Sequence, residues 1–289
     1  MSKYNREKKT FIANTDSSVI EYPNETYQAN PTLLEKLPEW LRNFKTNFDT
    51  IGFQRHIGDL PKIKGSALIV DHPFSGSLEK HLNALQKYTG TIFTCDRALY
   101  KILPYKIPTY VVNVDSSYLC MSFFDRPDVR EHMKDITAIF SAMTFPLTIR
   151  TWHGKRVFFI PWIDDYLTQS LMAIAKLPAL NAGGCVHNTC YALAYALGAN
   201  PIGLLGIENS YDDLSQTEYP DVHHEKIETQ FGTRYSDPAY LHYANIMLSW
   251  AEVFYNQSKV QTFNCTQNGI TYGKHIREIS LESFIADFC

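Results

Sequence analysis

The chain has 289 residues, of which 45% are hydrophobic and 20% are charged, and its formal charge at pH 7 is −3. This balance is typical of globular proteins and excludes collagen-like, coiled-coil and intrinsically disordered chains. The slight negative charge argues against a protein that binds a nucleic-acid backbone non-specifically. No apolar run reaches the roughly 20 residues that are needed to span a bilayer. The polar N-terminus lacks the apolar core of a secretory signal, so we expect a cytoplasmic protein.

The N-terminal part of the chain differs in pattern from the rest. Residues 1–30 are polar and rich in turn formers, and they predict a loosely packed arm. Residues 33–48 repeat leucine and aromatic side chains near a period of 3.6 and predict a helix. We therefore assign residues 1–60 to an N-terminal arm and helix, and residues 61–289 to one Rossmann-like domain.

Strands and helices alternate from residue 66 onward. Short apolar runs at 66–71, 91–96 and 108–115 predict buried strands, and the amphipathic segments 77–88 and 97–103 predict helices between them. This alternation is typical of a parallel, right-handed α/β layer. The predicted fold class is therefore α/β: a Rossmann-like, mostly parallel sheet flanked by helices, with an N-terminal helical arm.

The second half of the chain continues the alternation less regularly. A Gly-Gly turn at 183–184 leads into a helix that Gly198 ends, and a strand at 201–207 follows. The remaining predicted elements are a helix at 129–140, a strand at 155–163, a long polar loop or lid at 212–236, an amphipathic helix at 239–256, a strand at 259–265 and a closing helix at 280–288 with Ser280 as its N-cap.

Five of the predicted strands end in polar side chains. The carboxyl ends of parallel strands lie at one edge of a sheet, and that edge is where open α/β sheets bind ligands. One such residue alone usually caps a helix or forms a turn. Four carboxylates converging on one edge favour a binding site, which the sequence assigns to Asp71, Asp96, Asp115, Glu208, Asn209, Asn264 and Thr266.

Two glycine-containing turns are candidate phosphate sites. Ser75, Gly76 and Ser77 precede a predicted helix, whose free amide groups and positive dipole end attract phosphate, although a plain strand–helix turn fits equally well. Gly183 and Gly184 allow a backbone to approach a ligand closely. His187 and Asn188 would then lie in the first turn of the next helix, where His187 serves either as an acid/base or phosphate contact or as a structural residue.

The carboxylates also raise the question of metal binding. Carboxylate oxygens are suitable ligands for a Mg²⁺ ion that accompanies a nucleotide, and Asp96 and Asp115 are the candidate ligands. Equally, Asp115 could orient a ribose, and Asp96 could cap a helix. His223 and His224 are adjacent and lack a third ligand, so they predict no transition-metal site. The cysteines follow no zinc or redox spacing and are expected to be reduced thiols: Cys95, Cys120, Cys185, Cys190, Cys265 and Cys289.

Several segments carry a family resemblance, in the same order along the chain: SALIVDHPFSGSLEKHL, IFTCDRALYKIL, IPTYVVNVDSS, ALNAGGCVHNTCYALAYALGANPIGLLGIENSY and FNCTQNGITY. From about residue 50 to the C-terminus, the chain resembles the motility accessory factor (Maf) family, glycosyltransferase-like proteins associated with flagellin glycosylation. The same superfamily contains the 6-hydroxymethylpterin pyrophosphokinases with an MptE-like domain. The family turn Gly-x-Gly-Pro-Ser-Leu is here residues 73–78, of which only Ser77 and Leu78 match it, and Glu208 stands at the family's aspartate.

The resemblance implies a nucleotide-dependent transferase, and the leading hypothesis is glycosyl transfer from a nucleotide-sugar donor to an unknown acceptor. The backbone at 75–77 and 183–184 would hold the phosphates, and Asp115 and Asn264 the ribose or base. His187 or Glu208 would serve as acid/base. One alternative is a Mg²⁺-dependent pyrophosphokinase acting on a 6-hydroxymethylpterin-like alcohol; the other is a non-catalytic nucleotide-binding module, for which the altered turn at 73–78 argues. An oligomer is compatible with each hypothesis.

Overall fold

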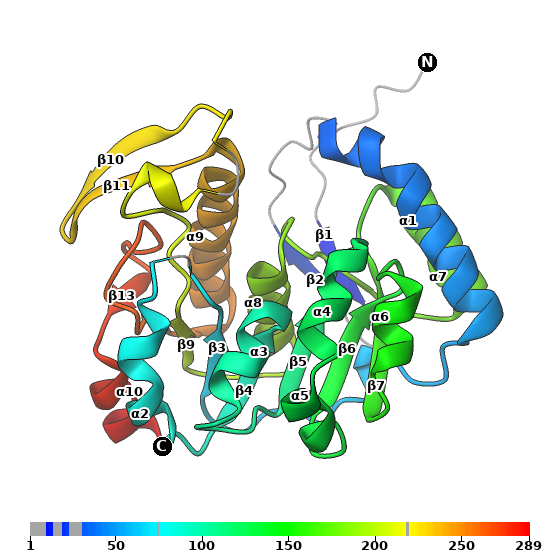
Figure 1. Cartoon of the computed structure of the whole chain (residues 1–289), viewed down its shortest axis with the longest axis horizontal. Helices are drawn as coiled ribbons and strands as arrows, with labels where there is room; N and C mark the ends of the chain where they lie inside the picture. The colour runs from blue at the N-terminus through cyan, green and yellow to red at the C-terminus, as the bar shows by residue number, and fades with distance from the viewer. Residues whose placement is uncertain (1–9, 14–18, 23–30, 74, 218–219) are drawn as a thin grey trace.

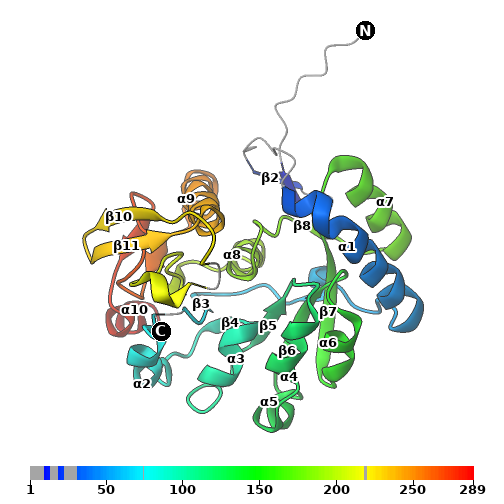
Figure 2. The same ribbon diagram turned by 45° about the horizontal axis from the view of Figure 1, so that its top comes forward.

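The computed structural model describes residues 10–13, 19–22, 31–73, 75–217 and 220–289, and its centre is one large parallel sheet. The sheet has nine strands in the order β13-β12-β9-β3-β4-β5-β6-β7-β8. Helices cover both of its faces, which confirms the predicted α/β, Rossmann-like class (Figures 1 and 2). Its strands are β3 (Ala67–Val70), β4 (Thr91–Cys95), β5 (Tyr110–Asn113), β6 (Thr137–Ser141), β7 (Lys155–Pro161), β8 (Ala179–Leu180), β9 (Ile202–Leu205), β12 (Thr262–Asn264) and β13 (Ile276–Glu278).

The helices and the smaller elements surround this sheet. The α-helices are α1 (Pro31–Thr50), α2 (Leu82–Leu85), α3 (Asp96–Ile102), α4 (Met121–Phe124), α5 (Pro127–His132), α6 (Pro146–Thr151), α7 (Asp165–Ala175), α8 (Val186–Ala196), α9 (Pro238–Ser258) and α10 (Leu281–Phe288). Short 3₁₀ turns are η1 (Ile57–Asp59), η2 (Leu78–His81), η3 (Tyr118–Cys120) and η4 (Leu214–Gln216). Two antiparallel pairs of strands form separate two-stranded sheets: β1 (Thr10–Ala13) with β2 (Val19–Tyr22), and β10 (Glu225–Thr229) with β11 (Gly232–Ser236).

The central strands are buried on both faces, so their side chains alternate between two cores. Ala67 and Ile69 of β3 pack in the core that α8 and α9 cover. Leu68 and Val70 point the other way and pack with side chains of α2 and α10. Figure 2 shows α8 and α9 on one side of the sheet and α2 to α6 on the other. This two-sided burial explains why the strands appear in the sequence as continuous apolar runs.

Helix α1 confirms the helix predicted at residues 33–48. It contacts the sheet at β7 and at the loop that follows β6. Phe44 is buried in the core that also holds Phe158 of β7. Asn47, which is fully buried, donates from Nδ2 to the carbonyl oxygens of Ala142 (3.0 Å) and Thr144 (2.8 Å), just beyond β6. The helix thus shares a core with residues 61–289. The arm expected at 1–30 lies mostly outside the described residues.

Three predicted elements are wrong in part. Residues 77–88 form the short η2 and α2 instead of one continuous helix. The helix predicted at 129–140 ends at His132, and residues 137–141 form β6, a strand that pairs with both β5 and β7. A short apolar run that is buried on all sides has no period that separates helix from strand, which explains the error at β6.

The segment 212–236 is the third correction, because it contains a hairpin where a long loop or lid was predicted. β10 and β11 pair in antiparallel register from Glu225–Ser236 to Thr229–Gly232. The strands at 66–71, 91–96, 108–115, 155–163, 201–207 and 259–265, the helices at 97–103, 185–197 and 239–256, and the Ser280-capped helix at 280–288 are confirmed. The patterns missed α6, α7, β8 and β13.

The order of the strands places a reversal between β3 and β9. The chain adds β4, β5, β6, β7 and β8 successively on one side of β3, then crosses back so that β9 pairs with the other side of β3. In open α/β sheets such a switch point leaves a crevice at the carboxyl ends of the strands. Within the ranges described above, no helix is both long and apolar enough to cross a bilayer.

Candidate functional site

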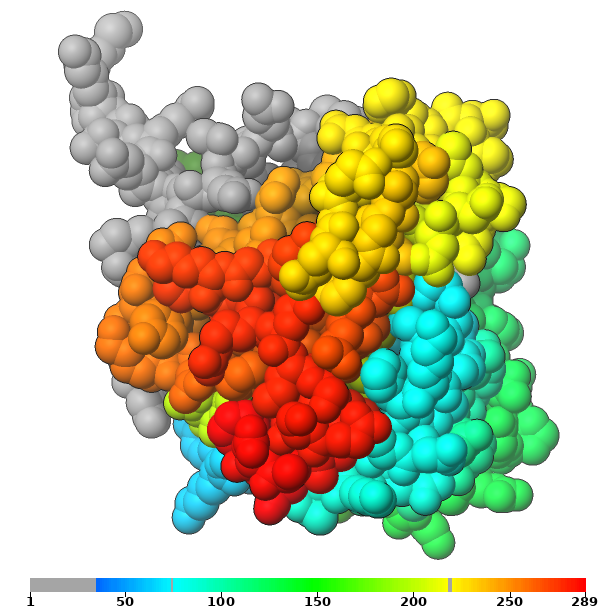
Figure 3. All heavy atoms as spheres, turned by 90° about the vertical axis from the view of Figure 1, so that its left-hand side faces the viewer, coloured from blue at the N-terminus to red at the C-terminus, as the bar shows by residue number. Residues whose placement is uncertain are grey.

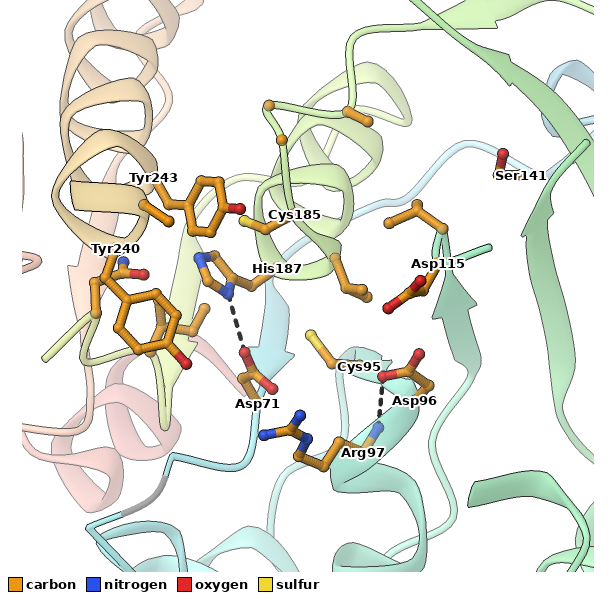
Figure 4. Close-up of a pocket in the computed structure, with 18 of the residues that line it drawn as sticks. Asp71, Cys95, Asp96, Arg97, Asp115, Ser141, Cys185, His187, Tyr240 and Tyr243 are labelled. Atoms are coloured by element: carbon orange, nitrogen blue, oxygen red, sulfur yellow. Dashed lines mark hydrogen bonds and ion pairs between the residues drawn. The ribbon is translucent and has the colours of Figure 1, made fainter. Parts of the chain in front are cut away.

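A cavity of about 760 Å³ lies at this switch point. The loops after β3, β4, β5 and β9 line it together with the turn before α8, while side chains of α1 and α9 add to its wall (Figure 4). The residues that sequence patterns singled out and that line the cavity are Asp71, Asp96, Asp115, Gly183, Gly184, His187, Glu208 and Asn209. Segments more than 100 residues apart in the chain are thus brought to one place.

Asp71 and His187 form a partly buried ion pair in the cavity wall. Asp71 follows β3, His187 lies in the first turn of α8, and His187 Nδ1 is 3.0 Å from Asp71 Oδ2. Burial by itself lowers the pKa of His187, but the interactions with Cys185 and Asp71 outweigh burial and raise this pKa to about 10. Burial raises the pKa of Asp71, and the partner His187 reverses this and holds it below its usual value. The pair is therefore an imidazolium and a carboxylate at neutral pH.

The Gly183-Gly184 turn gives α8 an open N-terminus. Both glycines have positive φ angles, and a Cβ atom at Gly183 would lie 2.6 Å from the Asn188 Cβ. Asn188 Nδ2 donates to the carbonyl oxygen of Gly183 (2.8 Å), so Asn188 holds the turn in place instead of lining the cavity. The N-cap residue Cys185 makes no side-chain capping bond. The first-turn amides of α8, which have no partners inside the helix, are consequently available at the cavity.

Asp96 is a buried acid beside the cavity. Its Oδ2 accepts a hydrogen bond from Asn113 Nδ2 (2.5 Å), and its Oδ1 accepts one from the backbone N–H of Arg97 (2.7 Å). Burial raises the pKa of Asp96, the hydrogen bonds oppose burial, and the charges of Asp115 and Asp71 raise it further, to about 7. Asp96 is thus about half protonated near neutral pH.

The predicted magnesium site can be compared with this arrangement. Mg²⁺ binds carboxylate oxygens, and both oxygens of Asp96 already accept hydrogen bonds from Asn113 and Arg97. Asp115 Oδ1 accepts from the backbone N–H of Ser117 (2.8 Å). Among the residues that the structure describes, no three His, Cys, Asp or Glu side chains gather as metal ligands. These side chains do not fit a resident Mg²⁺ ion.

Asp96 gives a pH dependence that can be measured on the folded protein. Its folded-state pKa is above the usual 3.8, so the folded protein disfavours the ionised form, and stability falls as the pH rises from about 4 to 7. At about 1.4 kcal/mol per pKa unit, we expect the Asp96→Asn variant to gain roughly 3–4 kcal/mol relative to wild type over this range. Urea unfolding at several pH values measures this difference. The exposed Asp135→Asn serves as control, and parallel curves for wild type and Asp96→Asn would contradict the prediction.

Glu208 lies at the cavity, but its carboxylate is occupied. Glu208 Oε2 is 2.5 Å from Arg234 Nη2, and both side chains are almost completely buried. Its Oε1 accepts a hydrogen bond from Ser75 Oγ (2.6 Å). Arg234 comes from β11 and also pairs with Asp212. Glu208 therefore anchors the β10–β11 hairpin to the end of β9, with one oxygen bonded by Ser75 and the other by Arg234.

The other predicted site residues do not line the cavity. Asn264 Oδ1 accepts from the backbone N–H of Thr266 (2.9 Å), and Thr266 Oγ1 accepts from the backbone N–H of Gly206 (2.7 Å). These bonds shape the loop after β12 and tie it to the end of β9. Ser75 Oγ accepts from the backbone N–H of Ser77 (3.2 Å) as well as bonding Glu208. The predicted residues outside the cavity lining are Ser75, Gly76, Ser77, Asn188, Asn264 and Thr266.

Sequence patterns missed several residues of the cavity. Arg97 follows Asp96 directly, and its charge helps to lower the pKa of Asp71. Tyr243 of α9 lies edge-on to His187, with ring centroids 6.2 Å apart, and Figure 4 shows both beside Cys185. Arg97 could have been predicted as a cavity residue, because it follows the end of a strand. Tyr243 could not, because it lies in an amphipathic helix and the sequence does not show which elements that helix packs against.

Comparison with known proteins adds a family and a fold. Residues 39–213 match the family described as 6-hydroxymethylpterin diphosphokinase MptE-like. No curated protein matches the chain. Among solved structures, the MAf glycosyltransferase from Magnetospirillum magneticum AMB-1 is similar with a TM-score of 0.63 at 16% identity, over 85% of this chain and 38% of that one. At this identity the likeness shows a shared fold, and the chain spans well under half the length of that protein.

Proposed function

Because the chain belongs to the 6-hydroxymethylpterin diphosphokinase MptE-like family, we propose that it is a nucleotide-dependent transferase whose cavity binds the phosphates of an activated donor. The observation that carries this proposal is the ring of His187, paired with Asp71, beside the uncapped N-terminus of α8. Backbone amides and a positive dipole end bind phosphate, and an adjacent cation adds a charge-assisted hydrogen bond.

The form of transfer that we favour is glycosyl transfer from a nucleotide sugar. The departing nucleoside diphosphate accumulates negative charge, which a preorganised cation and helix N-terminus stabilise without a metal. The acceptor oxygen attacks the anomeric carbon, the bond from that carbon to the phosphate oxygen breaks, and the diphosphate leaves with the electron pair. Asp115, exposed at the cavity, accepts the acceptor's proton in this scheme. His187 acts as a cation, since it is already protonated, and Glu208 takes no part.

The alternative is diphosphate transfer from ATP to an alcohol of the 6-hydroxymethylpterin type. The family description favours it. Such a transfer requires Mg²⁺ on the nucleotide to neutralise its phosphates. The two reactions therefore differ in their dependence on Mg²⁺ and in their nucleotide.

Ligand-dependent stabilisation separates these possibilities. We expect UDP, CDP or GDP to raise the melting temperature without Mg²⁺, by several degrees at about 100 times the dissociation constant, where binding adds about 2.7 kcal/mol. A shift with ATP that appears only with Mg²⁺ would instead favour diphosphate transfer. If no nucleotide shifts the melting temperature, the proposed donor site is wrong. The diphosphate that binds then identifies the nucleotide sugars to assay for transfer.

A further inference from the structure

Cys185 is a side chain of the cavity that the proposed transfer does not use. It is the N-cap residue of α8, it is partly exposed, and it lines the cavity. Figure 4 shows its sulfur beside the imidazole of His187 and the ring of Tyr243. Cys95 and Cys120 also line the cavity but are buried, as are Cys190 and Cys265, whereas Cys289 is exposed at the end of α10.

His187 provides a second and independent observation at the same place. Its side chain is nine-tenths buried, and its Nδ1 is taken up by Asp71. Within the described part of the chain, its Nε2 is buried without a hydrogen-bond partner. A buried polar atom without a partner costs free energy. The imidazole therefore has a free position for a group that enters the cavity, next to the thiol.

The neighbours of Cys185 are those that activate a cysteine. The deprotonated sulfur is the nucleophile, and both an adjacent imidazolium and a helix N-terminus favour that form. Cys185, His187 and Asp71 supply a thiol, a ring and a carboxylate bonded to the ring, which is the general arrangement of an activated nucleophile. We propose that Cys185 is a nucleophilic thiol of this cavity, which exchanges with small disulfides to form a reversible mixed disulfide.

The atoms and electrons of this thiol–disulfide exchange balance without a further reactant. The sulfur of Cys185 attacks one sulfur of the disulfide, a new S–S bond forms as the old one breaks, and the departing thiolate takes the bonding electron pair. The small disulfide is the oxidant. The adduct occupies the space in front of the α8 N-terminus. On the proposed function, it would therefore exclude donor phosphate, and bound phosphate would shield the thiol.

The reaction of the full chain with 4,4′-dithiodipyridine, a small neutral disulfide, tests this inference. We expect a fast phase at pH 6 that peptide mass mapping assigns to Cys185, roughly 10 times faster than the reaction of the exposed Cys289. Cys185→Ser should remove this phase, and the matched Cys289→Ser should keep it. His187→Gln should slow the phase roughly 10-fold at pH 6, because the ring beside the sulfur is lost.

Each outcome bears on the inference in a defined way. A fast phase that maps to another cysteine, or a rate at pH 6 that His187→Gln leaves unchanged, would overturn it. Mapping on the wild-type protein gives this answer even if a variant fails to fold. A fast phase of Cys185 that no nucleoside diphosphate slows would support the nucleophilic thiol and count against the proposed donor site. Protection by the diphosphate that raises the melting temperature would support both.

Discussion

Replacing Arg234 by Met is expected to lower the free energy of unfolding by about 3–5 kcal/mol, because the substitution leaves the Glu208 carboxylate buried without its counter-ion. Both members of this pair are 2% exposed, so water cannot replace the lost partner. Arg234 Nε also donates to Ser210 Oγ (3.1 Å), and the guanidinium pairs with Asp212. Urea unfolding followed by circular dichroism measures the loss.

Two further variants make this result specific to the buried charge. Lys226→Met removes an ion pair with Glu228 that is exposed on the same hairpin, and it should leave stability unchanged. Adding Glu208→Gln to Arg234→Met removes the uncompensated charge, and it should restore part of the loss. A loss below about 1 kcal/mol for Arg234→Met would show that this buried ion pair contributes little to stability.

His187→Gln is expected to weaken binding of the nucleoside diphosphate by roughly 10- to 100-fold. A hydrogen bond between charged groups contributes about 1.5–3 kcal/mol, and glutamine keeps a donor but loses the charge. Isothermal titration at pH 7 measures the dissociation constant. His56→Gln is the control, because His56 also pairs with an aspartate, Asp59, but lies outside the cavity lining. The His56→Gln variant should bind the diphosphate with the same affinity as wild type.

Asp71→Asn adds a pH signature to the same experiment. Asp71 is one of the groups that raise the pKa of His187 to about 10, so the wild-type imidazolium persists until the pH approaches that value. Without Asp71, Cys185 is the main remaining group that raises the pKa of His187 against burial, so this pKa falls. We therefore expect Asp71→Asn to lose binding of the diphosphate at a lower pH than wild type does. Equal pH profiles would contradict the role given to this ion pair.

The sequence determined most of the secondary structure and the edge of the sheet that carries the site. Buried strands such as 66–71 are apolar on both faces, so local composition is enough to find them. Polar residues at the strand ends, including Asp71, Asp96 and Asp115, line the cavity as their positions predicted. This part was predictable because it depends on neighbours within a few residues along the chain.

Pairings between distant segments were decided only by the tertiary structure. The order of strands, with β9 beside β3, creates the switch point, and no local pattern reports which strands become neighbours. Asp71 and His187 are 116 residues apart, yet their contact fixes the charge of the site. Glu208 was predicted as an acid/base, and only the folded structure shows that its carboxylate pairs with Arg234, 26 residues later. The charge state and availability of a side chain depend on its burial and on its partners, and the folded chain alone brings these together.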